Sequence, residues 1–297
     1  MKNNNIVAAI DIGGTNTRIA YFDSEYNIID GSKIATDVYN PDAVIDYLIN
    51  SIFSRDFKVS GIGITAPGPI DYQRGMILDT PNLPGFRGYE LKTVMQNRCG
   101  VPVVLDNDAN LAGLGESVFG SGKGETIVQF YTVSTGIGAG LVINQTIYHG
   151  ARGNAMEIGN VIAWRNGPVQ GNLKPGAIEA IASGSAIVKR ALESGLKVKH
   201  AGEVNMLSIQ GNKQAISIME DAYEYLANTI AALYSAIEPN VIVLGGSLSL
   251  KIDGFCERLE SLVKEKAFSS QKEYVKLKLA LLGDDAGLYG AAYFANR

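Results

Sequence analysis

The sequence predicts an α/β fold made of two similar lobes with an active-site cleft between them. Short apolar runs rich in β-branched residues alternate with segments of helical spacing along the 297 residues, which is typical of α/β proteins. The opening pattern of strand, small-residue turn, strand, turn and strand returns in the second half of the chain. We therefore expect one lobe over residues 1–115, joined by the last helix over 285–297, and a second lobe over 116–284.

The first lobe is expected to begin with three strands in a meander. Its opening run is buried and β-branched, and a proline at residue 41 suits the first turn of a helix. The expected strands are Ile6–Ile12, Thr17–Phe22, Ile28–Ala35, Ser60–Thr65 and Pro102–Leu105, and the expected helices are Pro41–Phe53, Tyr89–Arg98 and Asn107–Phe119.

The second lobe repeats this order and ends in helices around two further strands. Residues 150–175 are rich in Gly and Asn and lack periodicity, which indicates a functional or mobile segment. The expected strands are Thr126–Ser134, Ala139–Ile143, Thr146–His149, Asn240–Leu244 and Val275–Leu279, and the expected helices are Ala215–Ile237, Phe255–Phe268 and Ala286–Asn296.

Composition excludes several classes of protein. The formal net charge is −4 and no basic run occurs, so neither a nucleic acid nor an anionic membrane is expected as a partner. No segment has the length and apolarity of a signal peptide or a membrane helix. The two cysteines, Cys99 and Cys256, lie far apart and in no metal-binding spacing. A reducing, cytoplasmic location is expected.

A glycine-rich turn after the first strand predicts phosphate binding. Two glycines let the backbone come close to a ligand, and successive N–H groups in such a turn form an anion-binding concavity. The aspartate at the strand end can hold Mg²⁺ through water. The alternative is a simple hairpin turn in which that aspartate bonds its own backbone. The residues of this first phosphate loop are Asp11, Gly13, Gly14, Thr15, Asn16 and Thr17.

A second turn of this kind stands at the corresponding place of the other lobe. Thr135, Gly136 and Gly138 follow a strand, and two such loops on opposing lobes would hold a polyphosphate from both sides. Gly245 and Gly246 follow a further buried strand, where glycine lets an adenine or ribose lie flat on the backbone. The alternatives are a glycine-rich hairpin for the first turn and an ordinary strand-to-helix turn for the second. Residues 283–287 either belong to the same nucleotide site or begin the last helix with an Asp cap.

Polar side chains gather where the strand Pro102–Leu105 ends and a helix begins. Strand ends of this type line the ligand crevice in open α/β sheets. Asp108 can accept a proton from a substrate hydroxyl, as the catalytic aspartate of kinases does, and Asn107 can bind neighbouring hydroxyls. The alternative is a helix N-cap, which accounts for one residue of Asp106–Asn110 and not for all.

Other side chains carry weaker signals. Glu157 and Glu179 suit bidentate binding of sugar hydroxyls, although surface loop acids are the common case. Two single histidines, His149 and His200, are expected to be unpaired, solvated or core residues rather than a catalytic pair. Trp164, with Tyr148, can stack on a sugar ring, although core packing is the default expectation.

Taken together, these motifs resemble the ROK family, which joins bacterial repressors, uncharacterised reading frames and sugar kinases. The matching segments run in family order along nearly the whole chain. They are Asp11–Thr17, Ala66–Asp71, Asn107–Asn110, Leu114–Glu116, Thr135–Gly140, Glu157–Gly159 and Glu179–Gly184.

The resemblance implies an actin-like, ribonuclease-H-like ATPase fold with two lobes, which uses ATP and Mg²⁺ and commonly dimerises. It implies that Asp108 is the catalytic base. It further implies that the sugar is bound by Asn107, Glu157 and Glu179, with Gly68 and Asn82 in segments that line the sugar site.

One segment departs from the family pattern. Most members carry a His at the position of Asn160 and a Cys-rich zinc motif before the Glu179 segment. Here Gln170, Asn172 and Ala177 stand where the cysteines would be, and these side chains cannot form a four-ligand zinc site. No structural zinc is therefore expected, and Asn160 takes the place of a usual sugar contact.

The zinc-less pattern resembles bacterial β-glucoside kinases, which phosphorylate the 6-hydroxyl of the non-reducing glucose in cellobiose-like sugars. N-acetylmannosamine kinase and glucokinase remain alternatives. A different class, a sugar-sensing transcriptional regulator of the same family, is disfavoured because the first strand begins near Ile6 and leaves no room for a DNA-binding segment. An actin- or chaperone-like ATPase that shares only the first loop is disfavoured by the Asn107–Asp108 pair.

Overall fold

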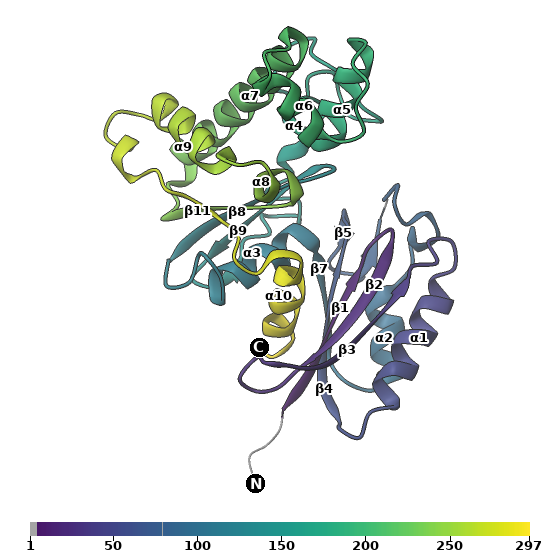
Figure 1. Ribbon diagram of the computed structural model, residues 1–297. Coiled ribbons are helices and arrows are strands. Elements are labelled where there is room, and N and C mark those ends of the chain that lie inside the picture. Colours follow the sequence, from purple (N-terminus) through teal and green to yellow (C-terminus); the bar gives the residue numbers. More distant parts are fainter. Residues whose placement is uncertain (1–4, 79) are drawn as a thin grey trace. The chain divides into compact units, whose positions relative to one another are not determined.

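The computed structural model describes residues 5–78 and 80–297, which form two compact units. Unit 1 comprises the described part of residues 1–119 together with 149–155 and 284–297. Unit 2 comprises residues 120–148 and 156–283. Within the described residues, each unit holds a five-stranded sheet and its own helices (Figure 1).

The sheet of unit 1 has the strand order β3-β2-β1-β4-β7. The first three strands form an antiparallel meander, and β4 and β7 add to β1 in parallel. A separate two-stranded hairpin, β5–β6, follows β4 in the chain. The bounds are β1 Ile6–Ile12, β2 Asn16–Phe22, β3 Ile28–Ala35, β4 Val59–Ala66, β5 Ile70–Asp71, β6 Met76–Ile77 and β7 Val103–Asn107.

Helices cover both faces of this sheet (Figure 1). Ala8 and Ile10 of β1 share one core with α1 and α2, because alternate residues of a strand point to the same face. The opposite face lies so close to α10 that a Cβ added at Gly63 would come within 2.0 Å of the Ala291 carbonyl oxygen. The helices are α1 Pro41–Phe53, η1 Pro84–Phe86, α2 Leu91–Cys99, α3 Asp108–Val118, η4 Gly283–Asp285 (its first residue in unit 2) and α10 Ala286–Ala295.

Helices α3 and α10 pack through glycines at backbone distance. A Cβ at Gly290 would lie 1.8 Å from the Leu111 carbonyl oxygen, and one at Gly115 would lie 2.2 Å from the Ala286 carbonyl oxygen. Real Cβ atoms do not approach other atoms this closely, so both positions require glycine. The helix that carries the predicted base is therefore held directly by α10.

Unit 2 repeats the pairing scheme of unit 1 with the order β10-β9-β8-β11-β12. Again an antiparallel meander is extended by two parallel strands. Its strands are β8 Ile127–Val133, β9 Ile137–Ile143, β10 Thr146–Ile147, β11 Val241–Gly245 and β12 Leu277–Leu279. Its helices are η2 Ile158–Asn160, α4 Ile178–Ala182, α5 Gly184–Glu193, α6 Ala201–Ile209, α7 Lys213–Ile237, α8 Ser247–Lys251, α9 Phe255–Lys266 and η3 Lys272–Tyr274.

The predicted α/β class and repeated meander are confirmed, and the predicted elements occur with ends that are exact or shifted by one or two residues. Helices α4, α5, α6 and α8 and the β5–β6 hairpin were not predicted. Helix α6 shows why: Met206 and Ile209 are exposed, so its apolar residues do not follow one face.

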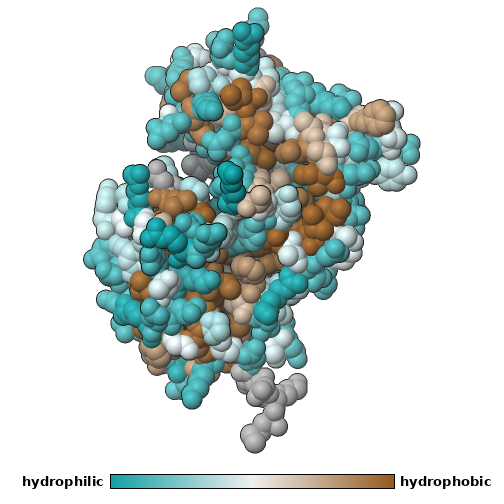
Figure 2. Space-filling view, turned by 180° about the vertical axis from the view of Figure 1, so that it is seen from behind, coloured by the Kyte–Doolittle hydropathy of each residue, from teal (hydrophilic) through white to brown (hydrophobic). Residues whose placement is uncertain are grey.

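Polar side chains cover most of the face seen in Figure 2, with hydrophobic side chains gathered in smaller patches among them. Within residues 5–78 and 80–297, no helix has both the length and the apolarity needed to cross a membrane.

Candidate active site

The predicted base lies where β7 passes into α3. Asn107 is the N-cap, and its side-chain oxygen accepts hydrogen bonds from the backbone N–H groups of Ala109 at 2.9 Å and Asn110 at 3.4 Å. Asp108 occupies the first helical position and is exposed. The cap that was the alternative interpretation is therefore supplied by Asn107, and the Asp108 carboxylate is accessible to a ligand.

Behind this junction lies a buried carboxylate with four donors. Asp106 is fully buried and accepts hydrogen bonds from the Asn107 N–H at 2.7 Å, the Asn110 amide at 3.0 Å and the Tyr72 hydroxyl at 2.9 Å. Its second oxygen lies 2.6 Å from Nε2 of His149. The prediction that His149 is unpaired is wrong, because its partner lies 43 positions away in the sequence.

Two predicted sugar-binding positions in unit 1 adjoin other predicted site residues. A Cβ at Gly68 would lie 2.8 Å from the Asn107 side-chain nitrogen, so Gly68 borders the start of α3. A Cβ at Gly14 would lie 2.9 Å from the Cβ of Asn82, so Asn82 borders the first phosphate loop. The structure thus brings together residues that lie 39 and 68 positions apart in the sequence.

The Thr36 side chain forms hydrogen bonds with the first phosphate loop. The Thr36 hydroxyl donates to the Gly13 carbonyl oxygen at 2.7 Å, and it lies 2.9 Å from the Thr17 hydroxyl. Thr17 is fully buried, so its hydroxyl supports the loop from inside instead of facing a phosphate, contrary to its predicted role. Gly14 and Thr15, by contrast, are exposed at the tip of the loop.

Arg18 links this loop to the start of α10. Its guanidinium contacts Asp11 Oδ2 at 2.9 Å and Asp285 Oδ1 at 2.8 Å. Burial raises the pKa of the Asp11 carboxyl, and Arg18 partly offsets that rise. Sequence reasoning missed Arg18, although a charged residue inside an apolar strand was a visible signal. Asp285 makes no side-chain cap to α10, so the cap predicted as one alternative is not formed.

In unit 2, Glu179 supports the second phosphate loop. Its Oε2 accepts a hydrogen bond from the Ile137 N–H at 2.7 Å, and a Cβ at Gly136 would lie 2.7 Å from the same oxygen. Glycine at 136 therefore leaves room for the carboxylate. Glu157 lies close enough to Glu179 for their charges to interact. Its side chain is exposed on one side, but the protein around its carboxyl partly excludes water and raises its pKa, and the charge of Glu179 raises that pKa further.

The raised pKa of Glu157 predicts that the Glu157→Gln substitution changes the melting temperature in a pH-dependent way. A carboxyl whose pKa is raised in the folded state favours folding below its ordinary pKa of 4.5, and this contribution is lost as pH rises through the folded pKa. At pH 7.5 the variant should therefore melt about 1–2 °C higher than the parent, and the difference should vanish near pH 4. Scanning calorimetry at both pH values measures this. Glu265→Gln is the matched control, because Glu265 is an exposed residue of α9 and the chemical change is the same. It should change Tm at neither pH. A lower Tm for Glu157→Gln at pH 7.5 would contradict the assignment.

Thr135 of the second loop and Ser247, the first residue of α8, line one pocket of about 750 Å³ in unit 2. A Cβ at Gly246, whose φ is +87°, would lie 2.5 Å from the Val133 carbonyl oxygen, so the backbone after β11 passes directly beside β8. Gly245 lies against the Phe130 ring. The Ser247 hydroxyl, directly after Gly246, lies 3.0 Å from the Ser134 hydroxyl, directly before Thr135, so the two predicted nucleotide-binding segments of unit 2 adjoin each other. Lys199 and Lys251 also line the pocket and were missed by sequence reasoning.

In the segment that departs from the family pattern, residues 160–177, the side chains make contacts other than metal ligation. Gln170 donates to the Ser185 hydroxyl at 2.6 Å, and Ala177 is buried, whereas Asn160 and Asn172 are exposed. Trp164 stacks on Tyr225, with ring centroids 4.9 Å apart. Among the described residues no three His, Cys, Asp or Glu side chains form a group able to hold a metal ion.

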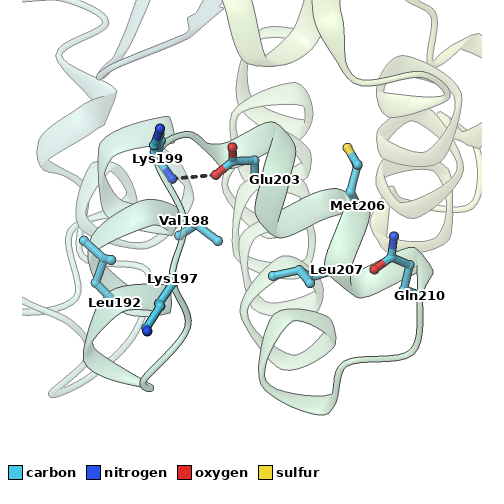
Figure 3. Close-up of a pocket in the computed structure, with 8 residues that line it drawn as sticks. All are labelled: Leu192, Lys197, Val198, Lys199, Glu203, Met206, Leu207 and Gln210. Atoms are coloured by element: carbon cyan, nitrogen blue, oxygen red, sulfur yellow. Dashed lines mark hydrogen bonds between the residues drawn. The ribbon is translucent and has the colours of Figure 1, made fainter.

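A further pocket of unit 2 contains none of the predicted site residues (Figure 3). It lies between the end of α5 and α6, where Glu203 accepts a hydrogen bond from the Lys199 N–H at 2.6 Å. Its lining residues are Leu192, Lys197, Val198, Lys199, Glu203, Met206, Leu207 and Gln210.

The model of the ROK family matches residues 7–297, which is nearly the whole chain. The chain belongs to the ROK family. The family prediction is thereby confirmed, and with it the actin-like fold of two units that each carry one copy of the meander.

Several similar ROK proteins are named as sugar kinases. A glucokinase of Halalkalibacterium halodurans is 29% identical, over 97% of this chain and 94% of its own. The crystal structure of a ROK hexokinase from Thermus thermophilus is 31% identical and superposes with a TM-score of 0.89, over 98% of both chains. A ROK glucokinase from Streptomyces griseus, solved with glucose and AMPPNP, is 28% identical with a TM-score of 0.79, over 98% of this chain and 99% of its own. These relatives confirm the predicted class, a sugar kinase.

Proposed function

We propose that this sugar kinase transfers the γ-phosphoryl group of ATP to the 6-hydroxyl of a hexose unit, and that its preferred substrate is a β-glucoside such as cellobiose. Asp108 is the base in this proposal. Asp108 and the first phosphate loop belong to unit 1, and Glu157, Glu179 and the second phosphate loop belong to unit 2.

The observation that carries the proposal is the arrangement at the end of β7. Asn107 caps α3, Asp106 is buried behind it, and Asp108 is exposed. Capping and burial thus engage the two neighbours, whereas the Asp108 carboxylate, which accepts a hydrogen bond from the Ala109 N–H at 2.8 Å, is exposed to a sugar hydroxyl. Accepting that proton as the oxygen attacks phosphorus is the task of a general base in kinases.

The described residues fit the outer shell of a magnesium ion. Asp11 gives Oδ2 to Arg18, whereas its Oδ1 accepts no hydrogen bond from any described residue and can bind a metal-bound water. When bound, Mg²⁺ neutralises charge on the phosphoryl oxygens. The backbone N–H groups of Gly14 and Thr15, exposed at the loop tip, are placed to donate to phosphate.

A pocket in unit 1 supports the disaccharide proposal. It has a volume of about 550 Å³ and lies between the β5–β6 hairpin and residues 149–155. The rings of Tyr72 and His149 and the polar side chains of Arg152 and Asn154 line it, and such mixtures of rings and amides suit sugar surfaces. Tyr72 and His149 both contact Asp106, two residues from the proposed base. We propose that this pocket receives the sugar unit that is not phosphorylated.

The sugar is tested by a coupled assay of ATP consumption with cellobiose, other β-glucosides, glucose, N-acetylmannosamine, N-acetylglucosamine and fructose. We expect the highest kcat/KM with cellobiose. Arg152→Ala should raise the KM for cellobiose several-fold and leave the KM for glucose unchanged. Turnover of glucose or N-acetylmannosamine without turnover of cellobiose would assign the chain to one of the alternative substrates.

We also propose that the protein holds no structural zinc. This is supported by the side chains at the positions of the family's zinc motif: Gln170 is engaged with Ser185, and Ala177 is a buried apolar residue.

A further inference from the structure

The two oxygens of the buried Asp106 carboxylate have different numbers of hydrogen-bond partners. Oδ1 accepts three hydrogen bonds, from Tyr72, the Asn107 N–H and the Asn110 amide. Oδ2 is contacted by His149 alone among the described residues. A buried carboxylate oxygen without a donor is strongly unfavourable, so His149 determines whether Oδ2 stays in its present position.

His149 reaches Asp106 from a segment that lies far away in the sequence. Residues 149–155 follow the meander of unit 2 and yet belong to unit 1. The segment packs tightly there: the rings of His149 and Tyr72 meet edge to face with centroids 4.8 Å apart. At Gly153, with φ +82°, a Cβ would lie 2.4 Å from the Tyr72 ring. This packing fixes the side from which the imidazole approaches.

Asp106 in turn fixes the chain on both sides of the proposed base. Its Oδ1 holds the backbone N–H of Asn107, immediately before Asp108, and the side chain of Asn110, two residues after it. Rotation of the Asp106 carboxylate would break both contacts together. A displacement of about 1 Å at a catalytic group lowers turnover by about 10²-fold.

We propose that His149 is a positioning residue for Asp108, acting through Asp106. This inference rests on the proposed role of Asp108. The imidazole Nε2 carries a hydrogen and donates a hydrogen bond to Oδ2, which holds the carboxylate in the orientation that aligns β7 and α3. His149 itself does not touch the reacting atoms in this proposal.

Two substitutions of His149 by an amide side chain test whether a donor must reach Asp106 Oδ2. In His149→Gln the side-chain nitrogen stands near the place of Nε2 and keeps a donor on Oδ2. In His149→Asn the same amide is one bond shorter and does not reach. We expect kcat to fall about 10–100-fold in His149→Asn, with the KM for ATP changed less than about 3-fold, and to stay within about 5-fold of the parent in His149→Gln.

Equal kcat losses in the two variants, or a loss confined to KM, would overturn the proposal, as would parental kcat in His149→Asn. Circular dichroism melting sets an assay temperature at which both variants are folded. A merely stabilising role would lower Tm in His149→Asn without separating kcat from KM at that temperature.

Hydrogen exchange separates this inference from the proposed function. Amides of residues 103–112 should exchange faster in His149→Asn than in the parent or His149→Gln, whether or not a sugar is phosphorylated. A parent protein that transfers phosphate to no sugar defeats the proposed function alone. Unchanged exchange in His149→Asn defeats the positioning role alone.

Discussion

Asp108→Asn is expected to lower kcat for sugar phosphorylation by about 10³-fold, because an amide cannot accept the hydroxyl proton as a carboxylate does. The variant should fold, since Asn107 supplies the cap of α3 and Asp108 is exposed. Nucleotide affinity should stay within about 2-fold of the parent. Coupled kinetics and calorimetric titration of an ATP analogue measure the two quantities.

A matched control for this prediction is Asp46→Asn on α1. Asp46 forms an exposed ion pair with Arg98 at 2.7 Å, and pairs of this kind contribute little to stability. The same chemical change there should leave kcat unaltered. If Asp108→Asn kept more than about a tenth of the parental kcat, Asp108 would not be the base.

Gly290→Ala is expected to destabilise unit 1 by about 3 kcal/mol, which corresponds to a fall in Tm of roughly 6–12 °C. The added methyl group would overlap the Leu111 carbonyl oxygen, which is part of the backbone and cannot move alone. Helices α3 and α10 would have to separate. Scanning calorimetry measures the effect.

Gly287→Ala, in the same helix, is the control. A Cβ there would lie 3.4 Å from the Thr65 Cγ2 atom, an ordinary contact, and alanine favours a helix more than glycine. This variant should melt at the parental temperature or slightly above it. Equal destabilisation by both substitutions would show that a methyl group anywhere in this part of α10 is unfavourable, and that the close approach at Leu111 does not govern the effect.

The fold could be predicted from the sequence where the information is contiguous. In the same way, a buried strand followed by glycines predicts each phosphate loop, and the polar residues after β7 predict the base, because every residue involved lies within a few positions of the others. The repeated meander could be predicted for the same reason.

Contacts between residues that are distant in the sequence could not be predicted. His149 and Asp106 lie 43 positions apart, and Arg18 and Asp285 lie 267 apart. Nothing local distinguishes a paired histidine from a solvated one. Thr17 illustrates the same limit, since its buried hydroxyl lies 2.9 Å from that of Thr36, which follows β3.

The membership of α10 in unit 1 has a consequence during synthesis. The ribosome makes α10 after all of unit 2, whereas β1 and β4 are among the first elements made. The sheet face around Gly61 and Gly63, which α10 covers, therefore has no partner while the intervening residues are translated. The unit that is begun first is completed last, and its uncovered face is the surface that a chaperone or a protease would meet on the nascent chain.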